Sequence, residues 1–237
     1  MDGYSSMLPS AGFSSIGIDV APFRLSGTVY GSLLNHRSAL AALGDAVNGP
    51  PYKAPPRAPV LYIKPRNTLA AAGDPVRIPA GCPELESAAC LGMVIGRTAC
   101  RVRAADALDH VAGYLIVNDV SVPHASYYRP SIREKARDGF CPLGPSVTPR
   151  ERIADPADIE MRTLIDGTLV QAASNRDLIR TPAQLLAEIT DFMTLAPGDV
   201  LCLGAAAPAP RVRAGQTVTI EMSGLGRLSN PFIGEDA

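Results

Sequence analysis

The sequence lacks several features that mark common functional classes. Its 22 Lys and Arg residues are balanced by 23 Asp and Glu residues, so it has no surplus of positive charge. A protein that binds nucleic acid through the phosphates needs such a surplus, and we therefore expect no nucleic-acid partner. No apolar run reaches the roughly 18 residues that a membrane-spanning helix requires, so we expect no membrane partner either.

The cysteines also lack the patterns of a zinc site or a disulfide framework. The chain has five of them, namely Cys82, Cys90, Cys100, Cys141 and Cys202. Their number is odd and no pair has Cys-x-x-Cys spacing, which favours free thiols. Free thiols are typical of a reducing compartment, so we expect a cytoplasmic protein. Residues 1–19 contain no Lys or Arg and do not resemble a signal peptide.

Proline and glycine are frequent along the whole chain, with 22 and 21 residues, so long helices are not expected to dominate. Many short strands joined by turns fit better. The predicted strands are Val60–Lys64, Ala88–Ile95, Ala112–Val120, Met161–Ile165, Val200–Leu203, Thr217–Met222 and Leu228–Ile233. Several are almost wholly apolar, which is typical of strands buried on both faces. Asp166-Gly167 predicts a tight hairpin turn.

Three segments predict helices: His36–Val47, Ala104–His110 and a third that begins after Thr181. In the third, Thr181 can act as the N-cap and Pro182 occupies the first helical position. We find no internal repeat and no low-complexity linker. The expected fold class is mainly β with short helices (α+β). We expect one domain over residues 27–237, preceded by a loosely held extension, residues 1–26.

Cations follow two of the predicted strands. Lys64 and Arg66 come at the end of one apolar strand, and the polar stretch that begins at Tyr128 contains Arg129, Arg133 and Lys135. Arginine holds a carboxylate in a bidentate pair and lysine acts as a point charge, so these residues could meet an acidic substrate from two sides. The alternative for the second stretch is a solvated basic loop.

Asp119 and His36 are candidates for acid–base or metal chemistry. Asp119 closes an apolar run, where a carboxylate is costly unless it is paired or coordinates a metal. The alternative is a turn residue that bonds its own backbone. His36 begins a predicted helix and could move protons near neutral pH, or it could make only a local hydrogen bond. We expect His110 and His124 to be surface or structural residues.

Glu84 and Glu86 form a Glu-x-Glu pair, a spacing that could hold a metal ion from one face of a strand. They follow Gly81, Cys82 and Pro83, before the apolar run begins. We therefore expect them in an exposed loop.

Taken in order, the motifs resemble the fumarylacetoacetate hydrolase superfamily. The matching motifs are Leu34-Asn35-His36-Arg37-Ser38, Pro51–Pro56, Ile63–Thr68, Asn118-Asp119-Val120, Tyr128-Arg129-Pro130, Arg137–Pro142 and Leu195–Asp199. The resemblance runs from about Gly27 to Pro231. Within the superfamily it is greatest to the N-terminal half, or separate N-terminal subunit, of the bifunctional isomerase/decarboxylases of 4-hydroxyphenylacetate (homoprotocatechuate) degradation.

The resemblance implies a rolled β-sheet fold, usually dimeric, and a site that stabilises an enolate. In active members a divalent cation, typically Mg²⁺, is held by a Glu-x-Glu pair and an aspartate, and acts as a Lewis acid. We take Lys135, Asp119 and His36 as candidate catalytic residues. The candidate substrate-binding residues are Lys64, Arg66, Tyr128, Arg129, Arg133 and Asp138.

The sequence departs from the superfamily pattern at three places. The Glu-x-Glu positions fall on Ala88 and Cys90, the family histidine falls on Ala39, and Gly-Thr-Pro becomes Gly204-Ala205-Ala206. Asp119 is then the one ligand position retained. We therefore expect no tightly bound metal, because one aspartate would hold Mg²⁺ weakly.

The implied function is an isomerase and/or decarboxylase of aromatic catabolism. Its substrate would be a carboxylated oxo-diene diacid, of the type of 2-hydroxyhepta-2,4-diene-1,7-dioate or 5-carboxymethyl-2-oxo-hex-3-ene-1,7-dioate. Isomerisation is favoured for the chain acting alone, because a proton shift asks less of a metal-free site than C–C cleavage does. The alternative is a catalytically impaired accessory subunit that pairs with a metal-binding paralogue. The expected assembly is a homodimer or a heteromer with such a paralogue.

Overall fold

The computed structural model describes residues 28–124, 126 and 128–235, so the predicted extension, residues 1–26, lies outside the described part. This part is mainly β with three short α-helices, which confirms the predicted class. The helices are α1 (Arg37–Ala41), α2 (Ile132–Lys135) and α3 (Pro182–Thr190). Short 3₁₀ segments are η1 (Gly44–Asn48), η2 (Arg66–Thr68), η3 (Ala107–His110), η4 (Arg150–Arg152), η5 (Pro156–Asp158) and η6 (Asn175–Asp177). No helix among these residues is both long enough and apolar enough to cross a membrane.

The larger sheet has eight strands and is built around one long antiparallel pair, β5–β6. Its order is β2 (Val60–Lys64), β1 (Val29–Leu33), β10 (Val200–Cys202), β5 (Leu85–Ile95), β6 (Val111–Ser121), β7 (Cys141–Pro149) and β3 (Leu69–Ala70), with β11 (Arg211–Val212) paired to the start of β5. In the central pair Ala88 lies opposite Asp119, and Glu86 lies opposite Ser121. This register fixes which side chains can meet at the site.

The smaller sheet has five strands. Its order is β4 (Val76–Ile78), β13 (Gly226–Gly234), β12 (Thr217–Met222), β8 (Glu160–Ile165) and β9 (Thr168–Ser174). The hairpin predicted at Asp166-Gly167 joins β8 to β9, and the φ angles of these two residues are 50° and 79°. Two successive positive φ angles are what a type I′ turn requires, so this prediction is confirmed.

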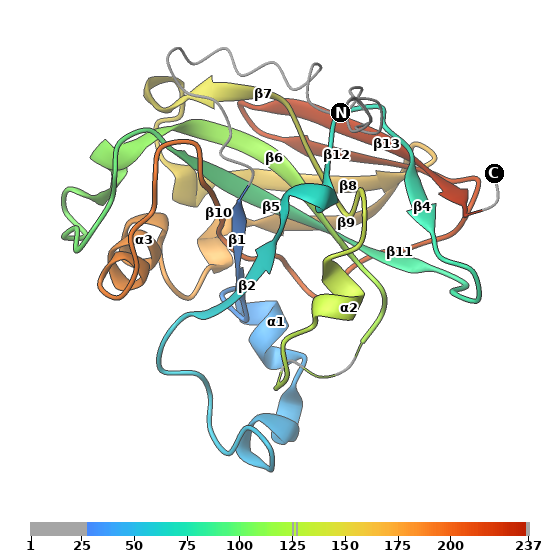
Figure 1. The fold of residues 1–237 in the computed structure, drawn as a ribbon, viewed down its shortest axis with the longest axis horizontal. Helices are drawn as coiled ribbons and strands as arrows, with labels where there is room; N and C mark the ends of the chain where they lie inside the picture. Colours follow the sequence, from blue (N-terminus) through green and yellow to red (C-terminus); the bar gives the residue numbers. More distant parts are fainter. Residues whose placement is uncertain (1–27, 125, 127, 236–237) are drawn as a thin grey trace, which may run out of the picture.

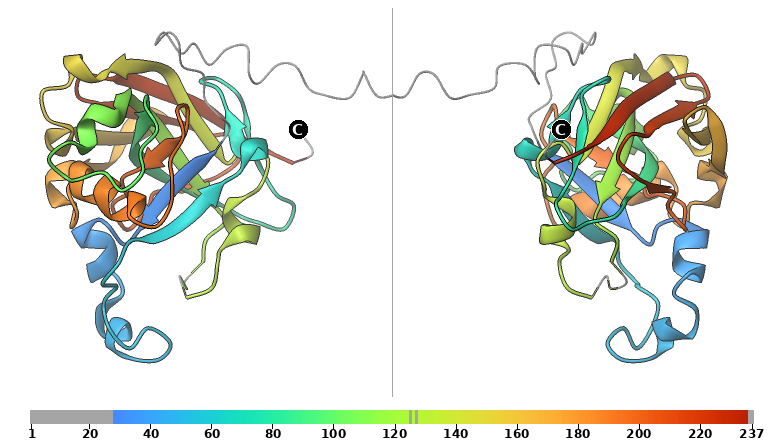
Figure 2. Two further views of the ribbon diagram at one scale, coloured as in Figure 1. Left: turned by 60° about the vertical axis from the view of Figure 1, so that its left-hand side comes forward. Right: turned by 90° about the vertical axis from the view of Figure 1, so that its right-hand side faces the viewer.

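The main core is formed by apolar side chains from both sheets and from α3. Leu91 and Met93 of β5 share it with Ile220 of β12, Phe232 of β13 and Leu185 of α3, all fully buried. Figures 1 and 2 show the two sheets lying against each other around this core. Because successive side chains of a strand alternate between its faces, the residues between these lie on the far side of β5.

The far face of the β5–β6 pair is apolar at one end and charged at the other. At one end Cys90 and Val94 of β5 pack with Leu115 of β6 in a second, smaller apolar cluster. At the other end the same face carries Glu86 of β5 and Asp119 of β6. Figure 1 shows α1, α2 and β2 at this end of the molecule. The sheet therefore presents a charged end to a group of short, loop-connected elements.

Several predicted boundaries are wrong in an informative way. The helix predicted over His36–Val47 ends at Ala41, and Gly44, with φ 50°, lies in the left-handed region where the chain leaves the helix. The segment that follows projects from the body in Figures 1 and 2. Strand β5 begins at Leu85, three residues earlier than predicted, so Glu86 lies in a strand and not in an exposed loop.

Candidate active site

A cavity of about 230 Å³ lies over the charged end of the β5–β6 face. Its polar lining consists of Ser32, Tyr62, Glu86, Asp119, Ser121, His124, Lys135 and Arg211. The opposite wall is apolar and made mostly of alanine, including Ala39, Ala42 and residues 205–207. Pockets for drug-sized ligands are commonly about 300–1,000 Å³, so this one suits a small metabolite with an apolar body and ionic ends.

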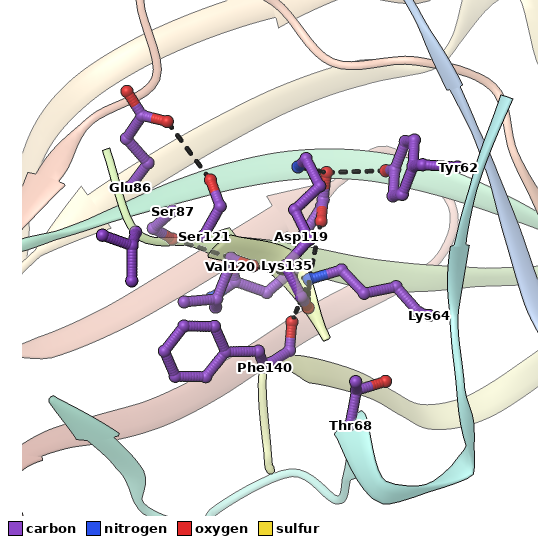
Figure 3. Close-up of polar contacts among 12 residues, drawn as sticks. Tyr62, Lys64, Thr68, Glu86, Ser87, Asp119, Val120, Ser121, Lys135 and Phe140 are labelled. Carbon is purple, nitrogen blue, oxygen red and sulfur yellow. Dashed lines mark hydrogen bonds and ion pairs between the residues drawn. The ribbon is translucent and has the colours of Figure 1, made fainter. Parts of the chain in front are cut away.

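Asp119 is the centre of the polar side. Its Oδ2 accepts hydrogen bonds from Lys135 Nζ at 2.7 Å and from the Tyr62 hydroxyl at 2.6 Å, and its Oδ1 lies 3.0 Å from Lys64 Nζ (Figure 3). Burial by itself raises the pKa of this carboxyl, but the two lysines and the two hydrogen bonds outweigh burial and hold the pKa below its usual range. Asp119 is therefore an ionised counter-ion and a poor general base.

Lys64 lies beneath Asp119 and is 1% exposed. Its Nζ donates to the carbonyl oxygens of Val120, Lys135 and Phe140 at 2.5, 2.8 and 2.8 Å. These three bonds use all three N–H groups of the ammonium, so its attraction to Asp119 Oδ1 is electrostatic. This agrees with Oδ1 having no aligned hydrogen bond. Lys64 was predicted to bind substrate, but it is absent from the described cavity lining; it ties Asp119 to the backbone around α2.

Lys135 presents the positive charge that the cavity can use. It ends α2, is 6% exposed and lines the cavity. Its Nζ lies 4.6 Å from the centre of the Tyr62 ring, a cation–π contact that holds the side chain in place. Lys64, Asp119 and Lys135 form what we call the buried cluster, with two positive charges and one negative. The excess positive charge favours an anion or a developing enolate above it.

Tyr62 lines the cavity and was not predicted from the sequence as a site residue. Burial, and then the nearby Asp119 carboxylate, raise the pKa of its phenol, so it stays protonated and acts as a donor. Its ring fits because Gly31 lies opposite it on β1; a Cβ at Gly31 would be 2.0 Å from the ring. The period-two pattern of β2, which puts Tyr62 on the face of Lys64, was the available signal.

His36 does not reach the cavity. It is the N-cap of α1, its Nδ1 lies 2.8 Å from the Ser38 hydroxyl, and its Nε2 lies 3.3 Å from the Ser174 carbonyl oxygen. Burial lowers the pKa of this imidazole, and a neutral ring with its proton on Nε2 satisfies both contacts. His36 therefore makes local hydrogen bonds, as in the alternative interpretation. Its position does not support the predicted proton transfer to substrate.

The remaining predicted substrate-binding residues lie elsewhere. Arg66 is exposed on η2, and Asp138 accepts a hydrogen bond from Asn67 at 2.7 Å. Tyr128, Arg129 and Arg133 line a separate depression, which shares His124 with the cavity. Among the described residues that line the cavity itself, Lys135 and Asp119 are the two predicted site residues that the fold brings together.

Four charged residues that were not predicted as a group form a chain of ion pairs, of which Glu86 and Arg211 line the cavity. We call Glu84, Glu86, Arg211 and Arg213 the rim cluster. Arg211 lies 3.1 Å from Glu86 and 3.7 Å from Glu84, and Arg213 lies 3.6 Å from Glu84. Glu86 also accepts a hydrogen bond from the Ser121 hydroxyl at 3.2 Å (Figure 3). Glu86 and Arg211 line the cavity, so it is charged at both ends.

Residues 28–233 match the family model described as fumarylacetoacetate (FAA) hydrolase C-terminal. The chain belongs to the fumarylacetoacetate hydrolase family. A curated relative, the 4-hydroxyphenylacetate degradation bifunctional isomerase/decarboxylase of Salmonella dublin, is 42% identical over 90% of this chain and 48% of its own length. The chain thus spans about half the length of that relative. The covered share fits either half, so our assignment to the N-terminal half stays a prediction, with the C-terminal half as the alternative.

Solved structures of this family confirm the predicted fold. The 5-carboxymethyl-2-hydroxymuconate delta-isomerase of Mycobacterium smegmatis matches with a TM-score of 0.76 and 30% identity, over 91% of this chain and 81% of that one. The 2-hydroxyhepta-2,4-diene-1,7-dioate isomerase of Mycobacterium marinum matches with a TM-score of 0.74 and 31% identity, over 91% and 77%. Both relatives are isomerases of unsaturated diacids by name.

A divalent metal does occur in the family. A maleylpyruvate hydrolase from Sphingobium was solved in complex with manganese(II) and pyruvate. It is 26% identical to this chain and matches with a TM-score of 0.72, over 87% of this chain and 70% of that one. The residues of this chain do not fit such an ion. Asp119 has a cation within 3.0 Å of each carboxylate oxygen, and the residue opposite it is Ala88. Among the described residues, no three His, Cys, Asp or Glu side chains gather to hold a metal.

Proposed function

We propose that this chain acts on an unsaturated oxo-diacid by stabilising its enolate with the charge of Lys135. The observation that supports the proposal most directly is the buried cluster, whose excess positive charge meets the cavity at Lys135. A cation that is held in place before the reaction stabilises developing negative charge better than water does, because it need not reorient. The substrate class is the one named for the isomerases that the chain resembles, 2-hydroxyhepta-2,4-diene-1,7-dioate or a close analogue.

In the proposed isomerisation the enol hydroxyl gives its proton to water in the cavity, and water returns a proton to carbon while the double bonds shift. The substrate oxygen lies against Lys135, and the protonated Tyr62 keeps Asp119 oriented as the counter-ion. Decarboxylation would use the same enolate but must also break a C–C bond. The isomerase is therefore the favoured activity of the chain alone. Its place would be aromatic catabolism of the 4-hydroxyphenylacetate type, as in the Salmonella relative.

The alternative is an accessory role beside a paralogue that binds metal. One observation favours it: Ala39 and Ala88, which stand where active members of the superfamily carry a histidine and a glutamate, both line the cavity. Neither side chain can move a proton or hold a cation. In this alternative the chain forms a heteromer with the paralogue, whereas the isomerase proposal is compatible with a homodimer.

Turnover of the purified chain on 2-hydroxyhepta-2,4-diene-1,7-dioate, followed by the loss of its ultraviolet absorbance, tests the proposal. Lys135→Met should lower kcat about 100-fold or more, since it removes the charge nearest the enolate. Lys53→Met is the matched control, because Lys53 is an exposed lysine far along the projecting segment. Chelation with EDTA should leave the rate unchanged. No turnover by the chain alone, with activity restored by a metal-binding paralogue, would establish the accessory role instead.

A further inference from the structure

Arg211 stands at the opposite end of the cavity from Lys135. It belongs to β11, where it pairs with Glu86, and it lines the cavity together with Lys135 and Asp119. Glu86 and Ala88 are two residues apart on one face of β5, and Ala88 lies opposite Asp119. Two residues of a strand span about 6–7 Å, and β11 and β6 lie on opposite sides of β5, roughly 10 Å apart, so the backbone positions of Arg211 and Asp119 are on the order of 12 Å apart. Because the arginine and lysine side chains are long, a short carbon chain can bridge the two cationic ends.

The guanidinium of Arg211 has capacity for a ligand. Its contacts are ion pairs with Glu86 at 3.1 Å and with Glu84 at 3.7 Å, and neither is an aligned hydrogen bond. A guanidinium carries five N–H donors in a planar fork, which matches a carboxylate bidentately. The side chain is 45% exposed, so its ion pairs are weak enough for a ligand to rearrange them.

The wall between the two cations suits a hydrocarbon chain. Ala88 lines the floor, and Ala205, Ala206 and Ala207 line the facing segment that leads into β11. These small apolar side chains leave room for the carbon chain of a ligand. A ligand with a carboxylate at each end and an apolar middle would meet a matching surface along its whole length.

We propose that Arg211 binds the remote carboxylate of the diacid substrate, in competition with Glu86, and so makes the site specific for dicarboxylates. The inference rests on the proposed function for the identity of the substrate and on the cavity for its binding mode. It assigns the recognition of the second carboxylate to a residue of β11 and not to Arg66, Arg129 or Arg133. Glu86 is the residue that the ligand must displace from the guanidinium.

Calorimetric binding of two unreactive probes tests this assignment without turnover. The probes are heptanedioate, with two carboxylates, and heptanoate, with one. Arg211→Gln should weaken heptanedioate binding about 10- to 100-fold, since hydrogen bonds to charged groups are worth about 1.5–3 kcal/mol, and should change heptanoate binding far less. Arg213→Gln is the matched control: Arg213 also pairs with Glu84 but is not among the described residues that line the cavity. It should bind both probes as the wild type does.

Glu86→Gln gives a second readout with the opposite sign. It removes the competing carboxylate and keeps Arg211, so heptanedioate should bind several-fold more tightly than to the wild type. This variant keeps the inference testable even if Arg211→Gln folds poorly. Equal weakening by Arg211→Gln and Arg213→Gln, or weaker diacid binding by Glu86→Gln, would overturn the assignment.

The two proposals can fail separately. A chain that prefers heptanedioate through Arg211 but turns over no diene diacid would overturn the proposed function and leave this inference standing. A chain that turns over the diene diacid with an unchanged KM in Arg211→Gln would overturn this inference and leave the proposed function standing.

Discussion

The two ends of the cavity hold charge in different ways. In the buried cluster the side chains of Lys64, Asp119 and Lys135 are 1–7% exposed, whereas in the rim cluster exposure runs from 19% at Glu86 to 75% at Arg213. The buried cluster has an excess positive charge, while the rim cluster has two charges of each sign. Buried ion pairs are costly to break and exposed ones are easily exchanged. One end of the cavity is thus built to hold a fixed field, and the other to adapt to a ligand.

The largest effect should come from removing the anion of the buried cluster. Asp119→Asn keeps the shape of the side chain but leaves the ammonium groups of Lys64 and Lys135 buried without a counter-ion. We expect the free energy of unfolding to fall by about 3–5 kcal/mol, the usual cost of breaking a buried ion pair. Urea denaturation monitored by circular dichroism measures it.

The control for this prediction is Asp138→Asn, which makes the same chemical change at an exposed aspartate. It should cost less than about 1 kcal/mol, because exposed polar contacts contribute little. An Asp119→Asn protein as stable as the control would show that the buried cluster is not the fixed element that the comparison requires.

A second prediction concerns how the stability of the fold changes at low pH. The folded state holds the pKa of Asp119 below the value of about 3.9 for an unfolded aspartate, and the charges of Lys135 and Lys64 are the cause that lowers it. A carboxyl with a depressed pKa stabilises the fold fully above the unfolded pKa, and that contribution is lost as the pH falls through the folded one. Wild-type stability should therefore drop below about pH 4, and more steeply than that of Asp119→Asn.

The measurement is urea denaturation at a series of pH values from 6 down to 3. Every carboxyl group other than that of Asp119 is present in both proteins, so the difference between the two curves reports on Asp119. Parallel curves for the wild type and Asp119→Asn would mean that Asp119 does not carry the acid sensitivity.

The sequence predicted the buried cluster better than the rim cluster. Lys64 and Asp119 each close an apolar strand, Lys135 lies in a dense polar stretch, and the family resemblance marked these residues as parts of the site. Arg211 meets Glu86 through β11, which pairs with β5 across a long stretch of chain. That pairing extends β5 back to Leu85, directly after the segment Gly81–Glu84 that predicts a loop, and no local pattern reveals it.

His36 shows a different limit of sequence reasoning. His36 was predicted to begin a helix, and two residues of the same segment, Ala39 and Ala42, do line the cavity. His36 is the N-cap, with an extended φ of −107°, so its ring turns back to cap α1 at Ser38. A cap and a first-turn residue differ by one position in the sequence, yet they send the side chain in different directions.

The smallest expected effect tests the adaptable end of the cavity. Glu84→Gln removes one carboxylate that is shared by Arg211 and Arg213, at 3.7 and 3.6 Å. Because these pairs are long and partly exposed, the free energy of unfolding should change by less than about 1 kcal/mol, and the change should shrink further at high salt, where exposed charges are screened. Urea denaturation in low and high sodium chloride measures both quantities. A salt-independent loss as large as that of Asp119→Asn would mean that the rim cluster is as rigid as the buried one. Arg211 would then have no freedom to leave Glu86 for a ligand carboxylate.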